Sequence, residues 1–214
     1  MTEAIHKVYI PSNKHWQWSY ELARRIDLSG WQPDIVIGLY RGGVFSSIII
    51  EDYLRSKGKG ALNFPLVCKS YDENTAESKP SECIVKLTAD NEKDILKLFK
   101  ERKRQLNVLI VDDICDTGKT LEAVIKKLNE YVMKVTDGAS LSPEDYILSF
   151  KFRTACLVWK PEVSHESPTW WIKESSQDEW IVFSHEFCGI NVNEKLYYEK
   201  KDNNNGQRQQ YKYS

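Results

Sequence analysis

Three aspartates and two threonines are closely spaced directly after the apolar run 108–111. Asp112 and Asp113 follow the run, and the segment Asp116-Thr117-Gly118-Lys119-Thr120 begins two residues later. A short turn that opens a helix offers a phosphate group unpaired N–H groups and the positive end of the helix dipole. Gly118 lets the backbone approach an anion closely, and the threonine hydroxyls add donors. Because paired carboxylates beside such a turn suit sugar hydroxyls and a hydrated cation, the segment predicts a sugar-phosphate site.

Two other interpretations explain parts of this segment. The sequence Gly118-Lys119-Thr120 would also fit the end of a P-loop, but that motif needs a glycine five residues earlier, where this chain has Asp113. Alternatively, Asp112 and Asp116 only cap a helix, which explains one acid and leaves the other two without a reason. We therefore expect a phosphate site that is not a P-loop.

The elements that must position these residues alternate between short apolar runs and stretches of helical periodicity, which favours the α/β class. The run 35–39 is apolar on both faces, as in a parallel sheet, where ligands bind beyond the carboxyl ends of strands. Trp16, Tyr20, Ala23 and Ile26 predict the buried face of a first helix. Further strands are expected at 64–68, 83–87, 108–111, 152–159 and 180–183, and further helices at 44–54, at 91–100 and around 121–128.

Composition narrows the function classes. The 214 residues include 30 Lys and Arg against 31 Asp and Glu, so no overall field indicates a nucleic acid or a membrane as partner. No apolar run approaches the ~20 residues of a membrane span, and no targeting segment is evident, so a cytoplasmic protein is expected. The five cysteines form no CxxC pair, which predicts reduced, buried thiols rather than a disulfide framework or a zinc site.

The strand, the paired acids and the Asp-Thr-Gly-Lys-Thr turn together resemble the phosphoribosyl pyrophosphate motif of the type I phosphoribosyltransferases, and the resemblance extends over residues 35–187. It implies a mostly parallel, doubly wound sheet with a small hood. Residues 1–193 would form a single domain whose hood comes from the N-terminal and C-terminal segments, followed by a polar tail at 194–214. The resemblance further implies that Asp112 and Asp113 serve the ribose hydroxyls. By the same resemblance the 5′-phosphate would be held by Asp116, Thr117, Gly118, Lys119 and Thr120.

A second match to the family is Tyr40-Arg41-Gly42-Gly43, directly after the strand at 35–39, which resembles the pyrophosphate-binding loop. Arg41 is a permanent cation with several donors, and the glycines expose N–H groups to a leaving pyrophosphate. In the family this peptide bond is often cis without proline. Taken alone, Arg-Gly-Gly is also typical of a tight turn between a strand and a helix. Lys69-Ser70-Tyr71 resembles the start of the flexible loop that closes over the reaction centre in hypoxanthine-guanine phosphoribosyltransferases.

The C-terminal third resembles the purine-binding end of xanthine-guanine phosphoribosyltransferases. By that resemblance Lys160 donates to the purine O6, Trp180 stacks on the ring, and the Ile181 backbone reads the base edge. A flat aromatic face with one cation suits a 6-oxopurine and disfavours adenine. The aromatic residues of this region could instead pack a small hood. The chain also departs from the family, because Ser184-His185-Glu186 replaces the usual Pro-Trp-acid ending.

The expected function is purine salvage: transfer of ribose 5-phosphate from phosphoribosyl pyrophosphate to hypoxanthine, guanine or xanthine. Asp116 would hold the base proton and Arg41 would neutralise the pyrophosphate. The expected cofactor is Mg²⁺, held largely through substrate and water near Asp112, Asp113 and Glu186. The partners would be these two small molecules and further copies of the chain, in a homodimer or homotetramer. The alternatives are transfer to another base, or a non-catalytic regulator that binds phosphoribosyl pyrophosphate.

Overall fold

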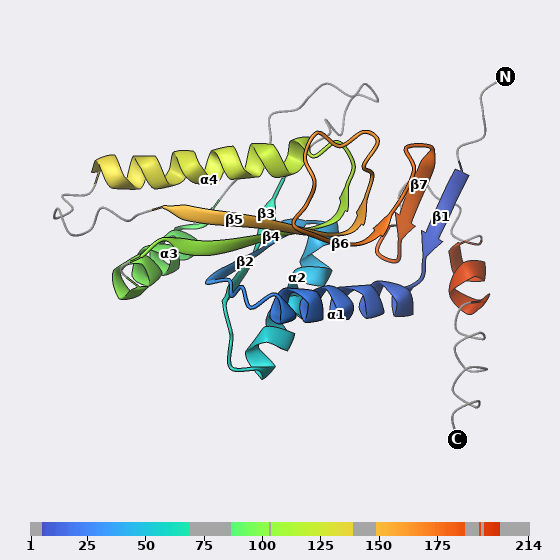
Figure 1. The fold of residues 1–214 in the computed structure, drawn as a ribbon, viewed down its shortest axis with the longest axis horizontal. Helices are drawn as coiled ribbons and strands as arrows, with labels where there is room; N and C mark the ends of the chain where they lie inside the picture. The colour runs from blue at the N-terminus through green and yellow to red at the C-terminus, as the bar shows by residue number, and fades with distance from the viewer. Residues whose placement is uncertain are drawn as a thin grey trace.

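The computed structural model describes residues 6–68, 87–102, 104–138, 149–186, 193 and 195–201. In chain order the elements are β1 (His6–Ile10), α1 (Ser12–Leu28), β2 (Ile35–Tyr40), α2 (Gly42–Ser56), β3 (Leu62–Val67), α3 (Ala89–Arg102), β4 (Leu106–Cys115), α4 (Lys119–Gly138), β5 (Phe150–Trp159), β6 (Trp170–Glu174) and β7 (Glu179–Phe183). Residues 195–201 add a short helix. Figure 1 shows the central sheet between α4 on one side and α1 and α2 on the other.

The central sheet has five parallel strands in the order β3-β2-β4-β5-β6. Strands β2 and β4 are apolar on both faces because each face is covered by helices. Ile35 and Ile37 belong to the core that includes the apolar residues of α3 and α4. Val36 and Leu109 belong to the core under α1 and α2. The expected doubly wound α/β fold is confirmed.

Strand order also locates the ligand edge of the sheet. From β2 the chain moves outward to β3 and then returns to the other side of β2 to form β4. Loops leaving β2 and β4 therefore diverge at the carboxyl ends of these neighbouring strands, which is where open α/β sheets bind ligands. These are the positions of the Tyr40–Gly43 segment and of the Asp112–Thr120 segment.

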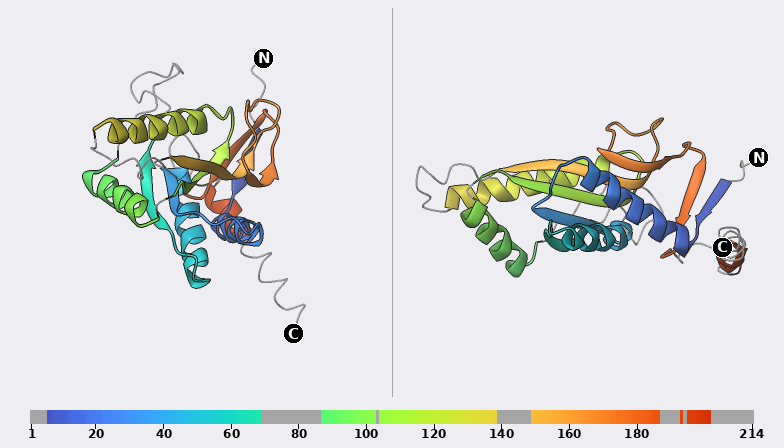
Figure 2. Two further views of the ribbon diagram at one scale, coloured as in Figure 1. Left: turned by 60° about the vertical axis from the view of Figure 1, so that its left-hand side comes forward. Right: turned by 60° about the horizontal axis from the view of Figure 1, so that its bottom comes forward.

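A second, two-stranded sheet lies at one end of the molecule (Figure 2), where β1 pairs in parallel with β7. We call β1, β7 and the helical residues 195–201 the hood. The rings of Tyr9 on β1 and Tyr198 on the short helix stack at 4.8 Å between centroids. Glu199 accepts hydrogen bonds from the backbone N–H and the hydroxyl of Ser12, at the first residue of α1. The hood therefore joins the first described residues of the chain to the last.

Several sequence expectations need correction. Trp16 and Tyr20 do not lie on the buried face of α1, since they are 51% and 39% exposed. That face instead carries His15 and Ser19, whose polar atoms find partners on distant segments. Strands β1 and β6 were not predicted, and β4 continues through both aspartates to Cys115. Most of the strand expected at 83–87 lies outside the described residues.

The expectation about the cysteines holds for only part of the set. Cys115 and Cys156 are free and buried. Burial raises the pKa of both thiols, which keeps them in the neutral form. Cys68, at the end of β3, is disulfide-bonded, so the prediction of reduced thiols throughout was wrong. An odd count and the lack of a CxxC pair do not exclude a single bridge.

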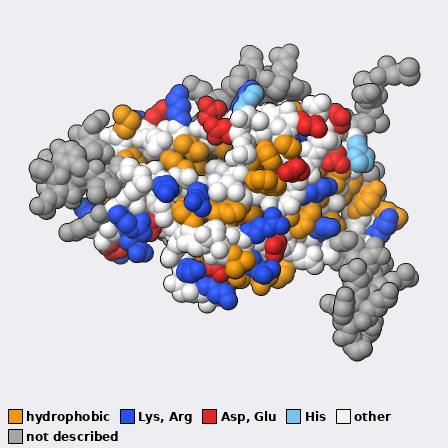
Figure 3. Space-filling model, in the orientation of Figure 1, with side chains coloured by type: hydrophobic (Ala, Val, Ile, Leu, Met, Phe, Trp, Pro, Cys, Tyr) orange, Lys and Arg blue, Asp and Glu red, His pale blue; other side chains and the backbone are white. Residues whose placement is uncertain are grey.

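Charged side chains do not form a field of one sign on the face shown in Figure 3, where acidic and basic groups are interspersed with hydrophobic ones. Within the described residues, no helix combines the length and the apolar character needed to cross a membrane.

Candidate active site

The loop of residues 116–120, which we call the phosphate loop, connects β4 to α4. Gly118 has φ of 81°, a left-handed conformation that favours glycine. Thr117 and Lys119 lie exposed on the loop, and α4 begins at Lys119. The Thr117 hydroxyl accepts from the Lys119 backbone N–H at 3.4 Å. The loop therefore presents backbone N–H groups and hydroxyls at a helix N-terminus, as a phosphate site requires.

Asp112 and Asp113, the acid pair, occupy successive positions in β4. Asp112 accepts from the Asp113 backbone N–H at 3.0 Å. Burial, followed by the neighbouring Asp113 carboxylate, raises the pKa of Asp112 well above its ordinary value. Asp113 is only 8% exposed and accepts from the Ile114 backbone N–H at 2.8 Å. Two carboxyl groups crowded in this way provide a place for a cation or for hydroxyl donors.

The Tyr40–Gly43 segment, or pyrophosphate loop, lies against this acid pair. The Tyr40–Arg41 peptide bond is cis, as the sequence resemblance implied, and both side chains are exposed. A Cβ atom added at Gly42 would overlap the Asp113 carboxylate, and one added at Gly43 would overlap the Val111 carbonyl oxygen. These glycines are therefore required so that the start of α2 can approach the end of β4.

Lys160, which follows β5, is oriented toward the phosphate loop. It is only 7% exposed, and its Nζ atom lies 3.6 Å from Asp116 Oδ2. Its backbone N–H donates to the Cys115 carbonyl at 3.0 Å, and the His165 N–H donates to the Thr117 carbonyl at 3.1 Å. The segment after β5 is thus fixed to the phosphate loop. Lys160 is therefore a buried ammonium beside a half-exposed carboxylate, unlike the exposed lysine that is common before proline.

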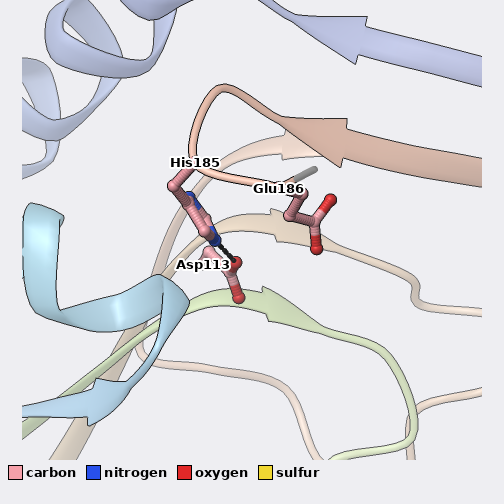
Figure 4. A group of neighbouring side chains, drawn as sticks. All are labelled: Asp113, His185 and Glu186. Atoms are coloured by element: carbon pink, nitrogen blue, oxygen red, sulfur yellow. Dashed lines mark ion pairs between the residues drawn. The ribbon is translucent and has the colours of Figure 1, made fainter. Parts of the chain in front are cut away.

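The turn after β7, residues 184–186, lies over the end of β4, as Figure 4 shows. His185 Nε2 is 3.4 Å from Asp113 Oδ2. Glu186 Oε2 accepts from the Phe183 N–H at 3.0 Å. Burial raises the pKa of Glu186 above its ordinary value, although this hydrogen bond opposes the shift. We call residues 184–186 the hood turn.

One ligand atom from each of Asp113, His185 and Glu186 lies within 4.8 Å of the others, so these side chains could hold a divalent cation. Asp113 and Glu186 offer the oxygen ligands that Mg²⁺ prefers, so their chemistry fits that ion, and the expected metal site stays a prediction. Asp112, which was also expected near the metal, is not a member of this group. His185 would add a softer nitrogen ligand.

Two further residues that sequence reasoning missed hold the hood turn in place. His15 of α1 is buried, and its Nδ1 lies 3.0 Å from the Ser184 hydroxyl. Burial, followed by the neighbouring His185, lowers the pKa of His15 to about 4, although Asp113 opposes the shift. Lys195 Nζ donates to the carbonyl oxygens of Ser184 (2.6 Å), Phe183 (3.1 Å) and Glu186. The only sequence signal was the departure at 184–186 itself, since nothing local links those residues to His15 or Lys195.

The residues expected to contact the base come from two parts of the fold, because Lys160 follows β5 whereas Trp180 and Ile181 lie on β7. Trp180, on β7 of the hood, has a 57% exposed side chain that is free to stack on a ring. Ile181 is buried in the same strand, opposite Val8 of β1. The expected flexible-loop residues Lys69, Ser70 and Tyr71 lie outside the described residues.

Comparisons with known proteins agree with this geometry. A family model described as a phosphoribosyl transferase domain matches residues 17–188. The fold is similar to that of a purine phosphoribosyltransferase from Pyrococcus horikoshii, with a TM-score of 0.56, 24% identity, and coverage of 86% of this chain and 98% of that chain. It is also similar to a hypothetical protein from Neisseria gonorrhoeae with bound ppGpp, with a TM-score of 0.61, 19% identity, and coverage of 94% and 99%.

A third solved structure, the xanthine-guanine-hypoxanthine phosphoribosyltransferase of Helicobacter pylori, has a TM-score of 0.53 and 18% identity, with coverage of 83% of this chain and 92% of that chain. No curated protein matches the chain by sequence. At these identities the solved structures support the fold, while the family model covers most of the chain. With its phosphate loop, acid pair and pyrophosphate loop brought to one edge of the sheet, the chain belongs to the phosphoribosyl transferase domain family and is a phosphoribosyltransferase.

Proposed function

We propose that this enzyme transfers ribose 5-phosphate from phosphoribosyl pyrophosphate to a 6-oxopurine, releasing pyrophosphate, in purine salvage. The observation that carries the choice of base is Lys160, whose buried Nζ lies 3.6 Å from Asp116 of the phosphate loop. At this position the Lys160 ammonium can donate to a carbonyl oxygen of a base that is bound next to the anomeric carbon. The amino group of adenine offers this ammonium no acceptor. The name of the Pyrococcus protein supports a purine as the base, and that of the Helicobacter protein lists three 6-oxopurines.

In this mechanism the phosphate loop holds the 5′-phosphate and the acid pair faces the ribose hydroxyls. In the structure the Asp113 carboxylate faces the His185 imidazole at 3.4 Å. When the substrate binds, Asp113 leaves this contact and faces the ribose hydroxyls. Displacement at the anomeric carbon passes through an oxocarbenium-like transition state, whose positive charge these carboxylates tolerate. Arg41 neutralises the negative charge of the departing pyrophosphate, and the half-exposed Asp116 accepts or holds the proton of the base.

Mg²⁺ bound with phosphoribosyl pyrophosphate supplies charge neutralisation for the pyrophosphate. Asp113 and Glu186 would hold it, with substrate oxygens and water completing the ligand set. We expect a cytoplasmic enzyme that forms a homodimer or homotetramer. Light scattering of the purified chain would measure its assembly state.

The test is a product assay with phosphoribosyl pyrophosphate, Mg²⁺ and, separately, hypoxanthine, guanine, xanthine, adenine, orotate and uracil. Nucleoside monophosphate from one or more 6-oxopurines, and little from adenine, is the expected result. A Lys160→Gln variant should lose this preference while keeping its affinity for phosphoribosyl pyrophosphate. Product from a pyrimidine alone would contradict the proposed base. Binding of phosphoribosyl pyrophosphate without product from any base would indicate a non-catalytic regulator.

A further inference from the structure

A cavity of about 400 Å³ lies in the hood, and none of its described lining residues is assigned above to either substrate. It opens to the surface and is bordered by β1, the first half of α1, the end of β6 and the short helix of residues 195–201. Its described lining consists of Val8, Tyr9, Ile10, Pro11, Lys14, Trp18, Lys173, Tyr198 and Lys201. The volume falls within the range of small-molecule sites, about 300–1,000 Å³.

The charge of this lining has one sign. Three of its described residues are lysines, from three different elements, and none is acidic. Glu199, the acid on the short helix, is occupied by the backbone N–H and hydroxyl of Ser12. Positive charges that line one pocket repel one another, and a bound anion relieves this repulsion. The pocket therefore has a raised affinity for anions. Lysine ammonium groups act on phosphate as point charges.

The remaining lining is aromatic and apolar. Tyr9 and Tyr198 stack with an interplanar angle of 10°, which makes a flat double layer at one wall. Lys14 Nζ lies 5.5 Å from the centre of the Trp18 ring, so one of the cations is held beside an indole face. Val8, Ile10 and Pro11 complete the apolar part of the lining. A ligand that satisfies both parts carries a planar ring together with a phosphate group.

We propose that this hood cavity binds a nucleoside monophosphate, at a site separate from the one for phosphoribosyl pyrophosphate. The base stacks on the aromatic wall and the phosphate is held by Lys14, Lys173 and Lys201. The cavity borders β1, and β1 pairs along its whole length with β7, which carries Trp180 and Ile181. Occupation of the cavity therefore stabilises the strand pair that presents the base-binding residues.

The experiment measures binding of AMP to the full chain by equilibrium dialysis, without phosphoribosyl pyrophosphate. Three double variants are compared: Lys14→Ala with Lys173→Ala in the cavity, Thr117→Ala with Thr120→Ala in the phosphate loop, and Lys93→Ala with Lys97→Ala on the exposed face of α3 as the matched control. We expect the phosphate-loop and control variants to bind AMP as the wild type does. The cavity variant should bind at least about tenfold more weakly, since two charge-assisted contacts are removed.

Adenosine and inorganic phosphate serve as half-ligand probes, and each should bind at least about tenfold more weakly than AMP because stacking and charge contribute separately. Transferase activity of the cavity variant shows that it is folded; if that activity falls, the single change Lys173→Met replaces it. The proposal is overturned if AMP binding is lost in the phosphate-loop variant and kept in the cavity variant. It is equally overturned if the wild type shows no saturable AMP binding, if inorganic phosphate binds as tightly as AMP, or if only an RNA oligonucleotide binds.

Discussion

The phosphate loop and the hood turn meet at the same edge of the central sheet, yet they are built from very different lengths of chain. Residues 116–120 follow directly from β4, and their conformation depends on Gly118 and the start of α4. The hood turn is held by His15 of α1 and by Lys195 of the short helix. A local motif thus forms one half of the site, and contacts between distant segments form the other.

The largest effect should come from the phosphate loop. Asp116→Asn removes the carboxylate that faces Lys160 at 3.6 Å and that would hold the base proton. Turnover should fall about 100-fold or more, the range typical of general acid–base groups. Binding of phosphoribosyl pyrophosphate, measured by calorimetry, should change little because the other phosphate-loop donors remain. Unchanged turnover in this variant would remove Asp116 from the mechanism.

His15, which contacts the hood turn from α1, should make the unfolding free energy depend on pH. The pKa of His15 is about 4 in the folded chain, against an ordinary value of 6.5 for histidine. The unfolded chain therefore takes up a proton below pH 6.5 while the folded chain does not, and stability falls as the pH drops toward 4. This group should account for up to about 3 kcal/mol of unfolding free energy over that range.

Urea unfolding of His15→Gln and wild type at several pH values measures this contribution, because other groups titrate in both proteins and cancel in the difference. Exposed His165→Gln is the matched control and should follow the wild type. Parallel pH profiles for His15→Gln and wild type would mean that the buried imidazole does not stabilise the hood turn in the neutral form.

A smaller effect is expected at the contact between the pyrophosphate loop and the acid pair. Gly42→Ala would place a Cβ atom on the Asp113 carboxylate, so the start of α2 must shift. The expected loss of unfolding free energy is about 1–3 kcal/mol, with weaker binding of phosphoribosyl pyrophosphate. Gly60→Ala is the control, since its Cβ would lie 3.5 Å from Arg55 Cγ in ordinary contact. Equal stability of the two variants would show that the pyrophosphate loop does not depend on this close approach.

The contrast also explains which features could be predicted from sequence. Phosphate-loop and pyrophosphate-loop residues are contiguous, and the strands before them are apolar on both faces, so their positions followed from local pattern. The hood depends on pairing β1 with β7, across most of the chain, which no local pattern reveals. The buried face of α1 was misjudged for the same reason: His15 and Ser19 are polar, and their partners, Ser184 and Ser46, come from other elements.

The sequence shows that residues 184–186 depart from the family pattern, but it does not show which residues they contact. In the structure His185 lies 3.4 Å from Asp113, and both lie close to Glu186. The relation between the acid pair and the hood turn is a contact between two strand ends that are about seventy residues apart. Predicting it would have required the strand order as well as the motif.

We propose that the phosphate loop binds phosphoribosyl pyrophosphate and that Trp180 on β7 of the hood binds the purine. Steady-state kinetics with both substrates varied, on Thr117→Ala and on Trp180→Ala, tests it most directly. Trp180 is 57% exposed, so its removal should leave the fold intact. We expect Thr117→Ala to raise the KM for phosphoribosyl pyrophosphate about tenfold and to leave the KM for the purine unchanged. Trp180→Ala should have the reverse effect. Equal increases for both substrates in both variants would contradict the division of the site.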